Sequence, residues 1–264
     1  MGVRGFVLTA ESVQDVVIRG LELRHNRQPG GQWPMVSVGQ CERVVIEDCR
    51  IYGSDFCGLG LGRSRDCAGI FYEINKGGII ADNLVYANRS RGIYISGSQN
   101  TWIVHNTVAG NDGGIVCMPR GDDWPLENVR VFNNLLIRNY VAADTTTRGC
   151  DLTIFMGCPE YGPYQRTVTS NHADYNVYAN TGWTPTLRHS WNPDNALHQW
   201  QQRFQEDLHS TLLPVAFELT GTRFVIKNGQ GLNSLAPLPD EVRAVLPGAS
   251  QVGCRRTEWP PSGK

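Results

Sequence analysis

Short stretches of alternating apolar and polar residues recur along the first two thirds of the chain, separated by Gly, Asn and Asp. Alternation with a period of two residues, bounded by turn-forming residues, is typical of β-strands and not of helices. In one set of stretches an apolar anchor precedes an Asn-like position by three residues; the anchors are Ile18, Ile46, Ile80, Ile103 and Val131. A second set, mostly introduced by Gly, interleaves with the first at residues 35–40, 58–63, 92–97, 114–118 and 151–157.

The anchors are 28, 34, 23 and 28 residues apart, so the chain is an imperfect repeat. A unit of this size holds two or three short strands and cannot bury its own apolar face, whereas stacked units share one continuous core. The pattern therefore predicts a solenoid, in which equivalent residues of successive coils lie about 4.8 Å apart.

An asparagine ladder is expected to run through this stack; its members are Asn83, Asn106, Asn134 and, in a degenerate copy, Asn176. Side-chain amides in such a column satisfy the backbone at a tight bend and hydrogen-bond to one another. Leu21 and Cys49 occupy the same column without sharing the chemistry of Asn. We therefore interpret the column as architecture and not as a functional site.

These features resemble the right-handed parallel β-helix family, which includes pectate lyases and other polysaccharide lyases, uronan epimerases and some glycoside hydrolases. The resemblance covers about residues 13–180. Its most specific stretch is 67–117, with a Gly-Ile-aromatic-acid segment, an Asn turn and a second Gly-Ile segment. It implies an all-β fold, a right-handed parallel β-helix solenoid, and a carbohydrate-active protein that is extracellular or periplasmic. Such folds host several chemistries, so the activity has to be argued from the site.

The repeat stops near Thr181, and we expect coils in residues 1–180 followed by a capping segment in residues 181–264. Apolar residues at helical spacing predict one helix over about 194–208, with Asp194 or Asn195 as its N-cap. Its apolar face would consist of Leu197, Trp200, Phe204 and Leu208. A one-sided helix of this kind would cover the open end of the last coil. The remaining irregular chain, with one strand at 223–227, is expected to pack on the outside of the solenoid.

Composition and charge exclude other classes of partner. The 264 residues carry a formal net charge of −1 without a long run of like charges, whereas nucleic-acid-binding proteins show a basic surface. No apolar stretch reaches the roughly 18–20 residues that span a membrane. We therefore expect a monomer that binds a polysaccharide, and neither nucleic acid nor membrane. The start of the chain lacks the pattern of a signal peptide, so the protein stays where it is made, or the sequence is a fragment or lacks its leader.

The eight cysteines include no CxxC motif and no Cys/His cluster with zinc spacing. Cys49 and Cys117 fit interior columns as buried thiols. The alternative is a disulfide that pins a loop, most plausibly between Cys57 and Cys67, which would suit an exported enzyme. We expect no metal site built on cysteine.

The candidate site lies on the sheet formed by the second set of strands. Alternation assigns the inward positions to Ile70, Tyr72, Ile74, Ile93 and Ile95. It assigns the outward positions to Phe71, Glu73, Tyr94 and Ser96. The preceding coil contributes only glycines, at 58, 60 and 62, so we expect a shallow trough that a flat polymer can approach. Four cations flank this trough in turns: Arg63, Arg65, Lys76 and Arg91.

This arrangement suits an anionic sugar polymer. β-Elimination of a uronate needs cations to neutralise the C5 carboxylate, a base for the C5 proton and an acid for the leaving oxygen. We expect Tyr94 to act as base or acid, and Arg91 with Lys76 to clamp the carboxylate. Glu73 would orient these groups or bind calcium, the one cofactor considered. Substrate binding is assigned to Arg63, Arg65, Ser96 and, in the loop 140–150, Arg148.

Two alternatives stay open. The same residues are compatible with a non-catalytic carbohydrate-binding or structural β-helix, including a truncated one, because outward Glu–Lys pairs and outward Tyr are common on solvated sheets. The paired Asp122 and Asp123 could serve a glycoside hydrolase. The companion Asn-x-Asp, Gly-His-Gly and Arg-x-Lys motifs of β-helix polygalacturonases are absent, however, and the pair is more typical of a turn. His105 is interpreted as a bend residue and not as a general base; its column contains Gly20, Asp48, Asp82 and Asn133.

Overall fold

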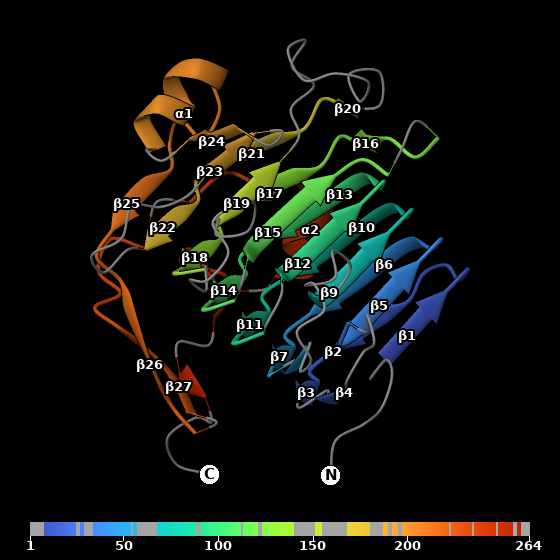
Figure 1. Ribbon diagram of the computed structural model, residues 1–264, viewed down its shortest axis with the longest axis horizontal. Coiled ribbons are helices and arrows are strands. Elements are labelled where there is room, and N and C mark those ends of the chain that lie inside the picture. The colour runs from blue at the N-terminus through green and yellow to red at the C-terminus, as the bar shows by residue number, and fades with distance from the viewer. Residues whose placement is uncertain are drawn as a thin grey trace.

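The computed structural model describes residues 8–24, 27–28, 34–53, 55–56, 68–88, 91–111, 113–120, 123–139, 151–154, 168–179, 187–189, 192–194, 197–221, 223–233, 235–246, 248–255 and 258–259. Its strands form three long sheets that run along a stack of coils (Figure 1). Adjacent strands within these sheets are parallel, apart from one pair at the C-terminal end of the first sheet. The stacked parallel coils confirm the predicted solenoid.

Successive coils contribute strands to the three sheets. The first sheet has the order β1 (Leu8–Glu11), β5 (Val36–Gly39), β9 (Ala68–Glu73), β12 (Arg91–Ser96), β15 (Gly113–Met118), β19 (Leu152–Ile154), β23 (Leu187–His189) and β24 (Asn192–Asp194). The second contains β2 (Val17–Arg19), β6 (Glu42–Glu47), β10 (Lys76–Ala81), β13 (Gln99–Val104), β16 (Leu126–Glu127), β17 (Arg130–Phe132), β20 (Val168–Thr169) and β21 (His172–Asp174). The third has the order β25 (Thr211–Leu213), β22 (Val177–Ala179), β18 (Leu135–Ile137), β14 (Thr107–Ala109), β11 (Leu84–Tyr86), β7 (Arg50–Tyr52) and β3 (Glu22–Arg24). A short pair, β4 (Arg27–Gln28) and β8 (Asp55–Phe56), lies apart from them.

The register of the second sheet reproduces the sequence repeat. Ile18 pairs with Ile46, Ile46 with Ile80, Ile80 with Ile103 and Ile103 with Val131. All five side chains belong to the interior core. The unequal spacings of the anchors therefore arise from connections of different length between equivalent strands.

The ladder asparagines are completely buried at one corner of the stack; they are Asn83, Asn106, Asn134 and Asn176. In the first three, the side-chain Nδ2 donates to the Oδ1 of the next ladder asparagine, at 3.0 to 3.1 Å. Each of the four also donates to the carbonyl of the anchor one coil back, as Asn106 does to Ile80 at 2.9 Å. A second ladder runs through Asn88, Asn111 and Asn139 and ends on Asp151. These bonds pair the polar groups that the corners bury.

The residue before each ladder position turns the chain through the left-handed backbone region. Gly20, Asp48, Asp82, His105 and Asn133 have φ angles between 51° and 68°. Gly, Asp and Asn tolerate this conformation better than other residues. The interpretation of His105 as a bend residue is therefore confirmed. Burial lowers the pKa of its imidazole, whose Nδ1 lies 2.9 Å from the Gln251 carbonyl oxygen.

A helix closes the C-terminal end of the core, although it is shorter than predicted. Helix α1 (Leu197–Phe204) buries Leu197 and Trp200 against the interior cluster. Leu208 lies beyond the helix and is 53% exposed, so its assignment to the apolar face is wrong. Asp194 is the last residue of β24, and α1 begins at Leu197; Asn195 lies outside the described residues.

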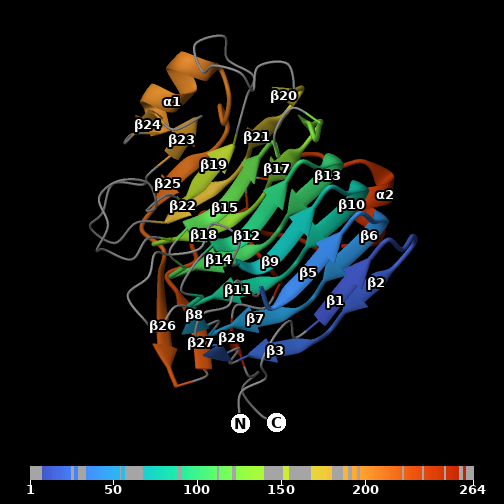
Figure 2. The same ribbon diagram turned by 45° about the vertical axis from the view of Figure 1, so that its right-hand side comes forward.

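The chain after α1 covers the outer faces of two sheets. The antiparallel strands β26 (Ala216–Thr220), β27 (Arg223–Lys227) and β28 (Glu258–Trp259) form a small sheet. Phe224 of β27 packs with Tyr86 and other outward residues of the third sheet. Helix α2 (Asp240–Ala244) places Val242 on Ala81 and Val104 of the second sheet (Figure 2).

Four cysteines are described, and all are buried: Cys41, Cys49, Cys117 and Cys254. Burial raises the pKa of the Cys49 thiol to about 11 and that of Cys117 further. Both are core fillers, as expected. Cys57 and Cys67 lie outside the described residues. No helix within the described ranges is long and apolar enough to cross a membrane.

Candidate functional site

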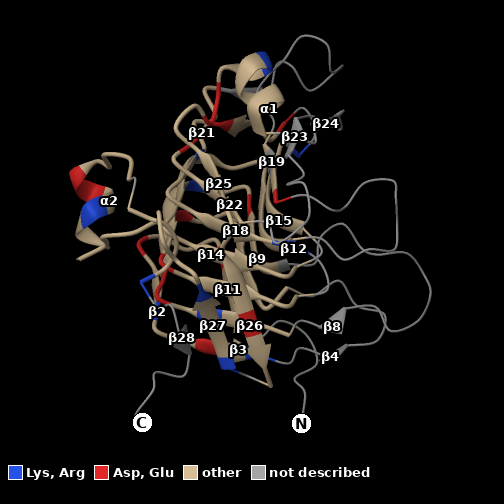
Figure 3. Ribbon diagram, turned by 90° about the vertical axis from the view of Figure 1, so that its left-hand side faces the viewer, with Lys and Arg blue, Asp and Glu red and all other residues tan. Residues whose placement is uncertain are grey.

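The outer faces of the three sheets differ in what covers them. C-terminal residues pack on the second and third sheets. On the first sheet the outer apolar cluster consists of Phe71, Tyr94, Val116 and Met118, and no described residue of the C-terminal segment belongs to it. In Figure 3, α2 lies on one side of the stack and β12 and β15 lie towards the other. The first sheet therefore carries the face at which the sequence places the candidate site.

Strand pairing arranges the outward residues in two rows across the coils. Phe71, Tyr94 and Val116 form one row, and Glu73, Ser96 and Met118 form the next. Their inward neighbours are fully buried: Ile70, Tyr72, Ile93 and Ile95. The predicted alternation is confirmed for these residues. Ile74 is the exception, because it lies at a corner with φ of 54° and is only partly buried.

Tyr94 is held on three sides and is only 5% exposed. Its ring packs against Phe71 with 5.2 Å between centroids, and the Arg91 guanidinium lies over it at 4.4 Å. Its hydroxyl donates to the Met118 sulfur at 3.0 Å. The structure thus brings together Tyr94 and Arg91, two of the predicted catalytic residues, as a cation–π pair.

Glu73 forms an ion pair with Arg120. The glutamate side chain is 22% exposed and the arginine side chain 52%. Arg120 follows Met118 by two residues, just after β15. The sequence analysis did not assign Arg120 to the site. The available signal was its period-two spacing from Met118, which continues the outward positions of β15 beyond the strand end.

Of two further predicted residues, Ser96 lies on the first sheet and Lys76 on the second. Ser96 lies between Glu73 and Met118 in the outward row and is 4% exposed. Lys76 is exposed on β10 of the second sheet, where it pairs with Glu42 and Gln99. The corner at Ile74 and Asn75 separates it from the outward row of the first sheet. This corrects the expected placement of Lys76, because the structure does not bring it together with Arg91.

The remaining predicted positions are mostly outside the described residues. Arg63, Arg65 and Arg148 are among them, as are Asp122 and the glycines at 58, 60 and 62. Asp123 is exposed in a turn. The described part of the Asp-Asp stretch therefore agrees with the turn that the sequence favours.

The right-handed β-helix region family model matches residues 4–156, which is more than half of the chain. The chain belongs to the right-handed β-helix family. No curated protein matches it. A solved complex of XylC with xylose is similar at 12% sequence identity and a TM-score of 0.38. That match covers 80% of this chain and 40% of the solved one, so this β-helix protein spans less than half the length of that relative.

The metal that the sequence suggests is calcium, with Glu73 as a ligand. Within the described ranges of this β-helix protein, no group of three or more His, Cys, Asp or Glu residues is placed to hold a metal ion. Calcium takes six to eight oxygen ligands, whereas the described surroundings of Glu73 supply the guanidinium of Arg120. The described residues therefore do not fit a calcium site.

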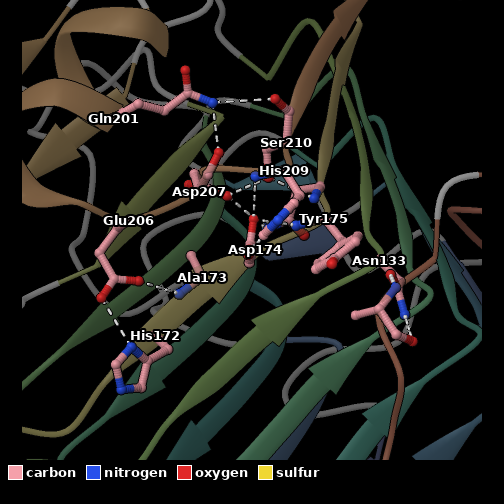
Figure 4. A network of polar contacts seen from close by, with 12 residues as sticks. Asn133, His172, Ala173, Asp174, Tyr175, Gln201, Glu206, Asp207, His209 and Ser210 are labelled. Atoms are coloured by element: carbon pink, nitrogen blue, oxygen red, sulfur yellow. Dashed lines mark hydrogen bonds and ion pairs between the residues drawn. The ribbon is translucent and has the colours of Figure 1, made fainter.

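A second polar cluster lies at the C-terminal end of the second sheet (Figure 4). His172 Nδ1 lies 2.9 Å from a Glu206 carboxylate oxygen, and His209 Nδ1 lies 2.7 Å from Asp174. The His209 ring stacks on Tyr175 with 4.5 Å between centroids. Both histidines are thus fixed by carboxylates at the surface of the β-helix.

The buried part of this cluster terminates the first ladder. Asn176 Nδ2 donates to Asp207 at 3.1 Å, and Asp207 also accepts from Ser210 at 2.6 Å and from Tyr178 at 2.9 Å. Burial raises the pKa of Asp207 to about 6. Because its carboxylate accepts from the ladder residue Asn176, from Tyr178 of β22 and from Ser210 after α1, we assign Asp207 a structural role.

Proposed function

We propose that this β-helix protein binds an acidic polysaccharide on the outer face of its first sheet and acts on it by β-elimination or C5 epimerisation. The observation that supports this most is the pairing of Arg91 with Tyr94 on the first sheet, to whose outer apolar cluster no described residue of the C-terminal segment belongs. The fold family agrees with a carbohydrate-active protein, and the reaction is argued from the residues.

The charges on this face favour an anionic polymer. Arg91 and Arg120 place two guanidinium groups towards opposite ends of the strands of the first sheet, since Arg91 begins β12 and Arg120 follows β15. A guanidinium binds a carboxylate through two parallel hydrogen bonds. Pairing with cations lowers the pKa of the C5 proton of a uronate, because the carboxylate charge that opposes its removal is neutralised.

Tyr94 is the residue best placed for proton transfer. In β-elimination a base removes the C5 proton, the C4–O bond breaks, and the leaving oxygen takes up a proton as a C4–C5 double bond forms. The Arg91 guanidinium lies over the Tyr94 ring at 4.4 Å, so the phenol and a cation that could bind the sugar carboxylate lie side by side. In epimerisation the C5 proton is removed from one face of the ring and a proton that can come from solvent is delivered to the other face.

A non-catalytic binding function is the second candidate, and one observation favours it. The Tyr94 hydroxyl is directed at the Met118 sulfur, and the side chain is almost fully buried. A phenol in this position reaches substrate only if Met118 moves. A binding protein would use the same face without that movement.

The test is an activity screen on alginate blocks, polygalacturonate and glycosaminoglycans, with and without calcium. Absorbance of the unsaturated uronate reports β-elimination, reducing ends report hydrolysis, and deuterium uptake at C5 in heavy water reports epimerisation. We expect absorbance or deuterium uptake that Tyr94→Phe reduces at least about 100-fold. Tyr175→Phe is the matched control, because it removes a phenol that lies at a distant corner.

The outcomes separate the candidates. Activity that Tyr94→Phe leaves intact would remove Tyr94 from the mechanism. Reducing ends without absorbance would support hydrolysis by Asp122 and Asp123. Affinity for a polyuronide without any turnover would support the binding function.

A further inference from the structure

The connection after β15 brings an exposed tryptophan beside the ion pair of Arg120 and Glu73. Trp124 is 43% exposed, and it is the one aromatic among the large apolar side chains found exposed in the described part of the chain. The backbone N–H of Arg120 donates to the Trp124 carbonyl at 3.0 Å and closes the turn between them. Neither residue takes part in the proton transfer proposed for Tyr94.

Gly97 provides the space in which this turn lies. A Cβ at Gly97 would be 2.8 Å from the Trp124 Cβ and 3.1 Å from the Arg120 Cβ. The φ angle of 53° also favours glycine there. Since Ser96 pairs with Glu73 on one side and Met118 on the other, Gly97 lies between the coils of the two ion-pair partners. Its missing side chain lets Arg120 reach back to Glu73.

The two side chains offer complementary binding groups. An exposed indole presents a broad, flat apolar face with a hydrogen-bond donor at its edge, which fits the C–H face of a pyranose ring. The Arg120 guanidinium has five N–H donors in a fork that matches a carboxylate. The guanidinium already pairs with the Glu73 carboxylate, so its N–H donors are oriented for pairing with a carboxylate.

We propose that Trp124 and Arg120 form a subsite for a uronate residue at the C-terminal ends of β12 and β15. The indole stacks on the sugar ring, and Arg120 shares its guanidinium between Glu73 and the sugar carboxylate. This inference rests on the proposed function, since it assigns one end of the same polysaccharide. It adds that the connection after β15, and not only the sheet, selects acidic over neutral sugars.

The test is isothermal titration of wild type and variants with oligogalacturonate, oligoguluronate and neutral galacto- and manno-oligosaccharides of equal length. We expect Trp124→Ala to weaken oligouronate binding about tenfold or more, and Trp124→Phe by less than about threefold because a flat ring remains. Leu219→Ala is the matched control, because it removes a side chain that is 40% exposed on β26. Thermal unfolding of each variant verifies that it is folded.

Arg120→Lys tests the charge recognition. We expect about tenfold weaker oligouronate binding, because an ammonium cannot form the bidentate pair, and unchanged binding of the neutral oligosaccharides. Arg243→Lys is the control, since Arg243 is also an exposed arginine paired with a carboxylate, that of Asp240.

The results distinguish this subsite from the proposed function. Oligouronate binding that Trp124→Ala and Arg120→Lys leave unchanged overturns the subsite and leaves the proposed function standing. Binding of neutral oligosaccharides alone overturns the acidic ligand class in both. Binding of none of these oligosaccharides by folded wild type overturns both as well.

Discussion

The ladder corners and the outer face of the first sheet both concentrate polar side chains, yet the two regions differ in how those side chains are used. At the corners, Asn83, Asn106 and Asn134 repeat in successive coils, are fully buried and bond to one another and to the backbone. On the outer face Glu73 and Arg120 differ from coil to coil and form a partly exposed pair. In a solenoid, a polar residue that repeats indicates architecture, and one that breaks the repeat is the better candidate for function.

The largest loss of stability should come from removing a ladder residue. In Asn106→Ala the N–H and Nδ2 of Asn83 lose their shared acceptor, and the Ile80 carbonyl loses a donor. We expect the free energy of unfolding to fall by about 3–5 kcal/mol, because each unpaired buried polar group costs about 1–3 kcal/mol. Urea unfolding followed by circular dichroism measures this loss.

Gln99→Ala is the control for the ladder prediction. Gln99 is a nearby residue whose amide bonds to Glu127 at an exposed position. We expect a change below about 0.5 kcal/mol there. Equal losses in the two variants would show that burial in the ladder has no special weight.

The next largest effect should come from Asp151 at the end of the second ladder, where a substitution is expected to raise the free energy of unfolding. Burial raises the pKa of Asp151 to about 6, above its value in an unfolded chain, so folding favours the protonated acid. This contribution to stability is present below about pH 4 and is lost as the pH rises to about 6. Asp151→Asn supplies the acceptor that Asn139 needs without a buried charge.

We therefore expect Asp151→Asn to stabilise the protein by about 1–3 kcal/mol at pH 8 and to make little difference at pH 4. Thermal unfolding of both proteins between pH 4 and pH 8 measures the difference. Asp123→Asn, at an exposed turn, should show no such trend. A variant less stable than wild type at pH 8 would mean that the ionised carboxylate is the preferred end of the ladder.

The repeated half of this comparison was predictable from the sequence. The anchors Ile18 to Val131 pair as their spacing indicates, because a one-residue slip would turn the whole apolar set out of the core. The alternation that places Tyr94 outward is of the same kind. Periodic constraints act in every coil and so leave a signal that one sequence suffices to read.

The rest depends on contacts that do not repeat. Arg120 reaches Glu73 across the coil between them, and no spacing rule encodes that distance. The sequence predicts Lys76 in a turn that flanks the trough, but the corner at Ile74 carries it into another sheet. The cover of the second sheet by α2 arises from residues far apart in the chain. The structure was therefore needed to show that the described C-terminal residues pack on the second and third sheets and not in the outer cluster of the first.

A smaller effect should come from filling the space that Gly97 leaves beside Trp124 and Arg120. In Gly97→Ala the new methyl would lie 2.8 Å from the Trp124 Cβ, on a backbone with φ of 53°. We expect a loss of about 1–2 kcal/mol from backbone strain, together with weaker oligouronate binding as the turn shifts. Thermal unfolding and titration of the same sample measure both. Gly39→Ala, where a Cβ meets nothing within 4 Å, is the control, and an equal loss of binding there would contradict the role of the turn.

The smallest effect on stability should come from Glu73→Gln, and this variant separates a structural role of Glu73 from a role in binding. Its ion pair with Arg120 is partly exposed, and exposed pairs contribute about 0–1 kcal/mol, so we expect a change below about 1 kcal/mol in urea unfolding. Oligouronate affinity should rise, because the amide no longer competes as a carboxylate for Arg120, while the affinity for neutral oligosaccharides stays the same. A loss of more than about 2 kcal/mol would place Glu73 with the ladder asparagines, among residues that hold the coils together. A small loss combined with a changed preference for charged sugar would place it among the residues that the fold does not need.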